Sequence, residues 1–272
     1  MTVRHPAVAG MFYPARADVL RAQVAAHLQA SAPLPTGAPP AGRLAALVVP
    51  HAGYVYSGPV AGVGYRLLPA LRTRIARVLL LGPAHYVPVR GLALSGADRW
   101  QTPLGAVEVD TGGRQRLLTG PAAVPVRVDD DAHRPEHSLE VQLPFLQTVL
   151  PDVPVLPVLV GDVDDVAAAE ALLPWWHDET CLTVVSTDLS HYEPDWSARD
   201  HDARTAAAIC RADASAIADH DACGSRPLRV LLRLAASDGA CVRLLDRRTS
   251  ADTAGSPERV VGYGAFAVER AA

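Results

Sequence analysis

Three histidines in this chain each follow a short apolar run that is typical of a β-strand. The runs and their histidines are 44–49 before His51, 78–81 before His85 and 182–185 before His191. In an open α/β sheet, ligands and catalytic groups gather beyond the carboxyl ends of the strands. The pattern therefore predicts that the three imidazoles share one rim of a sheet. Neutral imidazole is the commonest metal-binding side chain, so a metal centre is the chemistry that this rim favours.

A tyrosine follows each of these histidines closely, as Tyr54, Tyr86 and Tyr192. Tyrosines at these positions would supply aromatic walls and phenol donors to a common pocket. A simpler interpretation also stands for His51 and His85, namely that each is a turn residue that hydrogen-bonds to backbone.

The third motif, Ser186-Thr187-Asp188-Leu189-Ser190-His191-Tyr192, places a carboxylate three residues before its histidine. Asp188 would orient or polarise the imidazole of His191, which suits a general acid or base. The alternative is a capping aspartate beside a surface histidine.

A fourth cluster, residues 133–140, begins a segment that we expect to be helical. His137 and Glu140 would lie on one face of that helix because of their three-residue spacing, and they would contribute outer-sphere or substrate contacts. The alternative is a helix-capping arrangement around Ser138 and the neighbouring acids.

The chain has four cysteines, of which Cys223 stands directly before an apolar helical segment. A helix amino terminus favours a thiolate, so Cys223 is a candidate third ligand beside two histidines and is expected to be the most reactive thiol. We interpret Cys181, Cys210 and Cys241 as core residues because they lie inside apolar runs.

The segments that must position these residues alternate between strands and helices. Further strands are expected at 92–95, 153–160, 242–245 and 260–268, and a hairpin through 100–110 that turns at Thr102-Pro103-Leu104-Gly105. Helices are expected at 18–30 with Asp18 as the cap, 58–68, 138–150, 163–176, 198–211 and 227–236. This rhythm predicts a single α/β domain over residues 1–272, with a central, mostly parallel or mixed sheet flanked by helices. Residues 31–42, rich in Pro, Ala and Gly, are expected to form a surface loop.

Composition narrows the class of function. The chain has 272 residues, 49% of them hydrophobic, and a net charge of −4, so nucleic-acid binding has no electrostatic support. It contains no lysine, which removes any lysine Schiff-base mechanism. Cysteines without a CxxC pair, together with an amino terminus unlike a signal peptide, indicate reduced thiols in the cytoplasm. No apolar stretch approaches the roughly 20 residues of a membrane span.

The ordered set of motifs resembles the Memo family, the B component of the AMMECR–Memo–radical SAM system. The resemblance covers nearly the whole chain. It is carried by Ala7-Val8-Ala9-Gly10 with Phe12-Tyr13-Pro14, Pro50-His51-Ala52-Gly53-Tyr54 with Tyr56-Ser57-Gly58, Gly82-Pro83-Ala84-His85, Glu136-His137-Ser138-Leu139-Glu140 with Leu143-Pro144, the motif from Ser186 to Tyr192, and Cys223-Gly224.

The Memo family is similar in fold to the class III extradiol dioxygenases, in which two histidines and a glutamate hold non-haem iron. The resemblance implies that His51 and His85 are metal ligands and that Cys223 takes the place of the glutamate. It also implies that His191 is the acid/base residue, with Asp188 beside it. A thiolate in place of a carboxylate changes the metal preference and the redox potential.

The resemblance implies iron(II), with copper or zinc as other candidates, and redox chemistry on an unidentified substrate. A radical SAM enzyme and an AMMECR-type protein are the implied partners. Two alternatives remain at this point. The same pocket would serve a binding module for a peptide, small molecule or modified side chain, or a zinc-dependent hydrolase, although an HExxH motif is lacking.

Overall fold

A nine-stranded mixed sheet forms the centre of the computed structural model, which describes residues 1–29 and 42–271. Its strands, in spatial order, are β10 (His191–Glu193), β12 (Val260–Ala271), β2 (Gly42–Val49), β9 (Cys181–Ser186), β3 (Arg77–Gly82), β8 (Val155–Val160), β4 (Leu92–Leu94) and β7 (Val126–Val128), with β11 (Cys241–Thr249) paired to β12. A small second sheet contains β1 (Val3–Arg4), β5 (Arg99–Thr102) and β6 (Gly105–Glu108).

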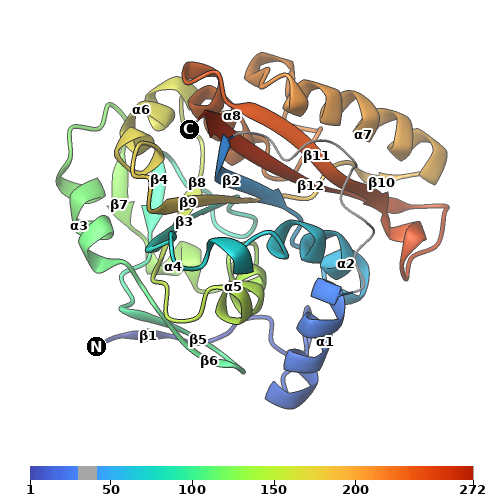
Figure 1. Cartoon of the computed structure of the whole chain (residues 1–272), viewed down its shortest axis with the longest axis horizontal. Coiled ribbons are helices and arrows are strands. Elements are labelled where there is room, and N and C mark those ends of the chain that lie inside the picture. Colours follow the sequence, from blue (N-terminus) through green and yellow to red (C-terminus); the bar gives the residue numbers. More distant parts are fainter. Residues whose placement is uncertain (30–41, 272) are drawn as a thin grey trace.

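Helices cover both faces of the large sheet (Figure 1). They are α1 (Ala17–Gln29), α2 (Tyr54–Tyr65), α3 (Thr111–Thr119), α4 (Asp130–His133), α5 (Leu143–Val149), α6 (Asp165–Trp176), α7 (Asp195–Cys210) and α8 (Ser225–Ser237). Short 3-10 turns occur at Pro69–Leu71, Glu140–Gln142, Ala214–Ala216 and Ser250–Asp252. Among the described residues, no helix combines the length and apolarity that a membrane crossing requires.

The central strands are buried on both faces because alternate side chains enter two different cores. In β2, Leu47 and Val49 join the core that contains residues of α1, α2 and α5. Ala46 and Val48 join the opposite core, which contains residues of α6, α7 and α8. The two helical layers therefore share one sheet, and the prediction of an α/β domain with a mixed sheet flanked by helices is confirmed.

Four neighbouring strands, β2, β9, β3 and β8, run parallel to one another. Their register is level at the carboxyl ends, since Val49 is opposite Ser186 and Leu81 is opposite Val185. The sheet becomes mixed on either side of them, where β12 is antiparallel to β2 and β4 is antiparallel to β8. The residues that follow β2, β3 and β9 consequently emerge at one edge.

The sequence located the strands that carry the histidine motifs and the hairpin of β5 and β6, which turns as expected between Thr102 and Gly105. The helix expected at 58–68 instead begins at Tyr54, whose backbone N–H donates to the Phe12 carbonyl at 2.8 Å. Asp18 lies inside the first turn of α1 and is therefore not its cap. Residues 31–41 of the expected surface loop lie outside the described residues, and Gly42 belongs to β2.

The segment expected to be one helix over 138–150 contains a 3-10 turn followed by α5, because Pro144 stands at the start of that helix and has no N–H to continue the first turn. The 3-10 turn carries Glu140, which is fully buried and bonds to the amino-terminal segment. Its carboxylate lies 2.7 Å from Arg4 Nη1 and accepts a hydrogen bond from Tyr13 Oη at 2.6 Å. It also accepts from the backbone of Ala7 and Val8. This carboxylate attaches the first residues of the chain to the domain.

We expect Glu140→Ala to lower the free energy of unfolding by about 3–5 kcal/mol, because removal of one partner from a buried ion pair leaves the Arg4 guanidinium buried without its charge partner. Urea unfolding followed by circular dichroism measures this change. The control is Asp18→Ala, which removes the exposed partner of Arg16 and should leave stability unchanged within error. A loss in Glu140→Ala no larger than that of the control would contradict the anchoring role.

Candidate functional site

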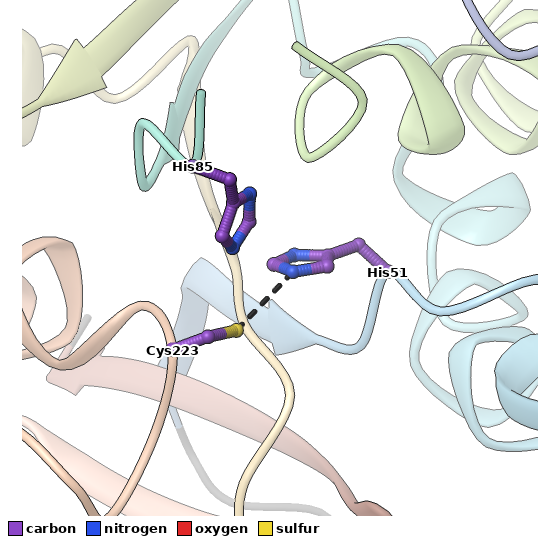
Figure 2. Close-up of side chains that lie close together, drawn as sticks. All are labelled: His51, His85 and Cys223. Carbon is purple, nitrogen blue, oxygen red and sulfur yellow. Dashed lines mark hydrogen bonds between the residues drawn. The ribbon is translucent and has the colours of Figure 1, made fainter. Parts of the chain in front are cut away.

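His51, His85 and Cys223 meet at the edge where the parallel strands end. His51 follows β2, His85 follows β3, and Cys223 lies in the loop before α8. The potential ligand atoms of the three residues all lie within 4.8 Å of one another. Figure 2 shows the two imidazoles and the thiol directed toward a common point. The predicted convergence of these three side chains is confirmed.

His51 is held in one tautomer by a buried polar network. Its Nδ1 lies 2.9 Å from Ser186 Oγ, whose hydroxyl donates its single proton to the Ser138 carbonyl at 2.6 Å. Ser186 Oγ therefore accepts from His51, and Nδ1 carries the proton. Gln142 Nε2 donates a second hydrogen bond to Ser186 Oγ at 2.7 Å. Burial lowers the pKa of His51 well below its usual range, so its Nε2 has a free lone pair that faces Cys223 Sγ at 3.2 Å.

Glu136 fixes the second imidazole in the same sense. Its carboxylate accepts from the backbone N–H of His85 and from His85 Nδ1 at 2.9 Å. It also accepts from the backbone of His137 and Ser138, each at 2.9 Å. Burial opposes ionisation of Glu136, but these hydrogen bonds and the nearby His85 outweigh it and lower the pKa to about 2. His85 Nε2 is thereby left to face the cavity, as metal-ligating histidines with a carboxylate partner are arranged.

Cys223 is positioned by the residues that follow β9. Its sulfur accepts a hydrogen bond from the backbone N–H of Asp188 at 3.3 Å, and the next residue, Gly224, donates to Thr187 Oγ1 at 2.8 Å. A Cβ atom at position 224 would lie 2.7 Å from the Thr187 side chain, so glycine is required for this close approach. Burial, together with the Asp188 carboxylate, raises the pKa of the Cys223 thiol in the metal-free protein.

Asp188 is bound differently from the prediction. Its Oδ1 accepts from the backbone N–H groups of His51 at 2.8 Å and Ala52 at 3.3 Å, so it fixes the turn that carries His51. It does not orient His191 through any hydrogen bond found among the described residues, although potential ligand atoms of Asp188, His191 and Cys223 lie within 4.8 Å of one another. Burial raises the pKa of Asp188 to about 7, against the effect of these two hydrogen bonds.

His51, His85 and Cys223 face a cavity of about 700 Å³. His191, at the start of β10, lines it, and burial lowers the pKa of this imidazole. Tyr86 and Tyr192 line it as predicted and are largely exposed at 55% and 64%. Arg259 lies over the Tyr192 ring, with its Cζ 5.2 Å from the ring centroid, and brings a cation to the wall.

His137 also lines the cavity, as predicted. Its ring stacks on that of His85 with 4.7 Å between centroids, and Phe12 packs against it at 4.5 Å. Burial lowers the pKa of His137 to about 4, so this imidazole is neutral near pH 7. It extends the aromatic wall beside His85.

Two predicted pocket residues lie elsewhere. Tyr54 is buried in the core, where its hydroxyl donates to the Val141 carbonyl at 2.7 Å, because the early start of α2 turns this residue inward. Glu140 binds Arg4 and the amino-terminal segment, so the three-residue spacing from His137 does not place the two on one face of a helix. Nor is a capping box built on Ser138, whose hydroxyl donates to the Pro83 carbonyl.

The interpretation of all three remaining cysteines as core residues is wrong for Cys241, which is exposed at the start of β11. Cys181 is buried and Cys210 is half-buried. Sequence reasoning also missed the residues that orient the imidazoles, namely Glu136, Ser186 and Gln142. Their only signal is that all three stand inside or next to the histidine motifs.

A sequence profile described as Memo-like protein matches residues 4–267, which is almost the entire chain. The chain belongs to the Memo-like family. Relatives named MEMO1 family protein include one from Archaeoglobus fulgidus, 35% identical, with 96% of this chain and 97% of the relative covered. Others come from Methanosarcina barkeri, at 35% identity with 98% and 100% covered, and Aquifex aeolicus, at 35% with 97% and 98% covered.

The Memo-like chain is also similar in fold to a solved structure, an uncharacterized protein from Escherichia coli K12. That match has a TM-score of 0.53 and 16% identity, and it covers 81% of this chain and 99% of the other. At this identity it bears on the fold alone. The resemblance to the Memo family that the motifs indicated is confirmed by the profile and by the curated relatives.

Glu136→Gln is expected to lower the free energy of unfolding by roughly 3 kcal/mol near pH 7, because the charged carboxylate is favoured in the folded state. The folded pKa of about 2 lies below the ordinary 4.5, so this stabilisation is fully present above pH 4.5 and is lost as the pH falls toward and through 2. Urea unfolding of both proteins at several pH values measures the difference. A difference that stays constant from pH 7 to pH 3 would contradict this account.

The structure reverses the predicted order of thiol reactivity. We expect Cys241 to be alkylated faster than Cys223 in the metal-free protein, because it is exposed while burial and Asp188 disfavour the Cys223 thiolate. Timed iodoacetamide labelling mapped by mass spectrometry measures both rates. In Cys241→Ser the fast phase should vanish, and a fast phase that remained on Cys223 would show that its thiol is activated.

Proposed function

We propose that this Memo-like protein is a metal-dependent redox protein with non-haem iron(II) held by His51, His85 and Cys223. One observation carries the proposal: both imidazoles bond through Nδ1 to Ser186 and Glu136, and both leave Nε2 next to the same thiol. Carboxylate and hydroxyl partners of this kind fix the tautomer and orientation of ligating histidines. Copper and zinc are the other ions that two imidazoles and a thiolate suit.

The donor set fits such an ion chemically. A thiolate is formed on metal binding, when the proton leaves Cys223, and it is then both a strong donor and a charge partner for the cation. Three protein ligands leave further positions for a substrate or water. When bound, the ion would supply redox chemistry or polarise a substrate atom.

His191 has the position of an acid or base in this proposal. It lines the same cavity, and burial favours its neutral form, which accepts a proton from a bound substrate. Asp188 contributes by fixing the His51 turn and by placing a carboxyl group close to His191 and Cys223. We assign it a positioning role.

The substrate that the cavity favours is a small molecule or a modified side chain. The cavity is lined by the aromatic rings of Phe12, Tyr56, Tyr86 and Tyr192, and Arg259 adds one cation. We further propose that the protein acts in the cytoplasm with a radical SAM enzyme and an AMMECR-type protein, on the ground of its family membership.

A binding module is the second candidate function. It is favoured by the exposure of Tyr86 and Tyr192 at the cavity, which suits contact with a peptide. A zinc-dependent hydrolase is the third, since two histidines and one cysteine with an open position also describe catalytic zinc sites. Elemental analysis of anaerobically prepared protein separates them: iron or copper supports the redox proposal, zinc the hydrolase, and absence of metal the binding module.

His51→Ala and His191→Ala should differ in what they lose. We expect His51→Ala to lose the metal, whereas His191→Ala should keep it and lose turnover or ligand polarisation by a factor of about 10² or more. Metal stoichiometry and spectra of the folded variants, measured side by side, test this difference. Equal metal loss would make His191 a ligand, and full retention by His51→Ala would overturn the proposed centre.

A further inference from the structure

A second group of ligand-type side chains lies behind the segments that carry His191 and Cys223. It contains His201 on α7 together with His220 and Asp221, which precede Cys223 in the same loop. Potential ligand atoms of the three all lie within 4.8 Å of one another. They line a surface depression of about 710 Å³ that is separate from the histidine cavity described above.

His201 stands between two carboxylates. Its Nδ1 lies 2.7 Å from Glu193 Oε1, and its Nε2 lies 2.8 Å from Asp221 Oδ1. Both carboxylates are fixed at their other oxygen, since Glu193 accepts from Ser197 Oγ at 2.6 Å and Asp221 accepts from the backbone N–H of Ala218 at 2.7 Å. The imidazole and its partners are therefore ordered before any ligand arrives.

We propose that His201, His220 and Asp221 form a second site for a divalent transition metal, with Zn²⁺ as the ion that suits it best. Glu193 bonds to the ring nitrogen of His201 that would not face the metal, which is the outer-sphere arrangement typical of zinc-bound histidine. Asp221 Oδ1 already lies 2.8 Å from His201 and 3.6 Å from His220 Nε2, so one ion between them would contact all three. Binding exchanges the proton on His201 Nε2 for the metal, and water completes the coordination.

The ligands differ in burial in a way that suits loading from solvent. The side chains of His201 and Asp221 are 14% and 13% exposed, whereas that of His220 is 80% exposed and 3.6 Å from Asp221. His220 is thus free to close over an ion held by the two fixed ligands. Two cations, Arg204 and Arg211, also line the depression, and Arg204 pairs with Asp200.

The positions of these residues in the chain connect the second site to the segments that carry His191 and Cys223. Asp221 lies two residues before Cys223, and Glu193 lies two residues after His191. An ion here would join α7, β10 and the loop before α8, and so fix the segments that present the thiol and the acid/base imidazole. This consequence for the first site rests on the proposed function, whereas the second site itself does not.

Titration of metal-free protein with Zn²⁺, followed by calorimetry and native mass spectrometry, tests the second site. We expect His220→Ala to bind one equivalent fewer than the unmodified protein, or to bind that equivalent at least about tenfold more weakly. His220 is exposed, so its removal leaves the fold intact. The matched control is His177→Ala, which removes an exposed histidine 3.8 Å from one carboxylate, that of Asp238, and should not change the stoichiometry.

The same comparison in a Cys223→Ser background separates this inference from the first site. Loss of one equivalent on adding His220→Ala supports the second site whether or not Cys223→Ser itself binds less metal. Cobalt(II) gives an independent signal, because thiolate-to-cobalt charge transfer requires a cysteine ligand, and the group of His201, His220 and Asp221 contains none. Equal stoichiometry and affinity with and without His220, or an equal loss in His177→Ala, would overturn the proposal.

Discussion

Level parallel pairing of three strands is the constraint on which the site depends. β2, β9 and β3 are neighbours, and their shared register ends them at one edge, so His51, Ser186 and His85 emerge together. A displacement of β9 by one residue would turn Ser186 to the opposite face of the sheet. The imidazole of His51 would then lose the hydroxyl that fixes its tautomer.

The polar residues around the site are buried at low energetic cost because nearly every one has a partner. Gln142 shows this best. Its Nε2 donates to the Pro50 carbonyl at 3.0 Å as well as to Ser186, and its Oε1 accepts from Tyr65 Oη at 2.9 Å. Unpaired, these groups would each cost roughly 1–3 kcal/mol. Fully paired, they give the imidazoles a single orientation between two apolar cores.

The sequence predicted those features of the fold and the site that depend on short stretches of the chain. The apolar runs before His51, His85 and His191 identified their strands. The expectation that the residues after these strands meet at one edge of the sheet agrees with the structure. Glu140 and Tyr54 were misplaced because their partners are far away in the chain: Glu140 bonds to Arg4 across 136 residues, and Tyr54 to Val141 across 87. The spacing of residues within a motif does not predict contacts between residues so far apart in the chain. The same reason hid the link between Asp188 and the backbone of His51.

The Arg4–Glu140 ion pair has a further consequence for how the protein is made. Phe12 packs on His137 and belongs to the segment that this ion pair attaches to the domain. One wall of the cavity is therefore fixed only after Glu140, 136 residues beyond Arg4, has been synthesised. The contact between His51 and Cys223 spans 172 residues. Contacts of such long separation cost loop-closure entropy, and a fold that is rich in them folds slowly. On the ribosome, the first strand-end histidine therefore exists long before its thiol, and the complete donor set appears only when most of the chain has emerged.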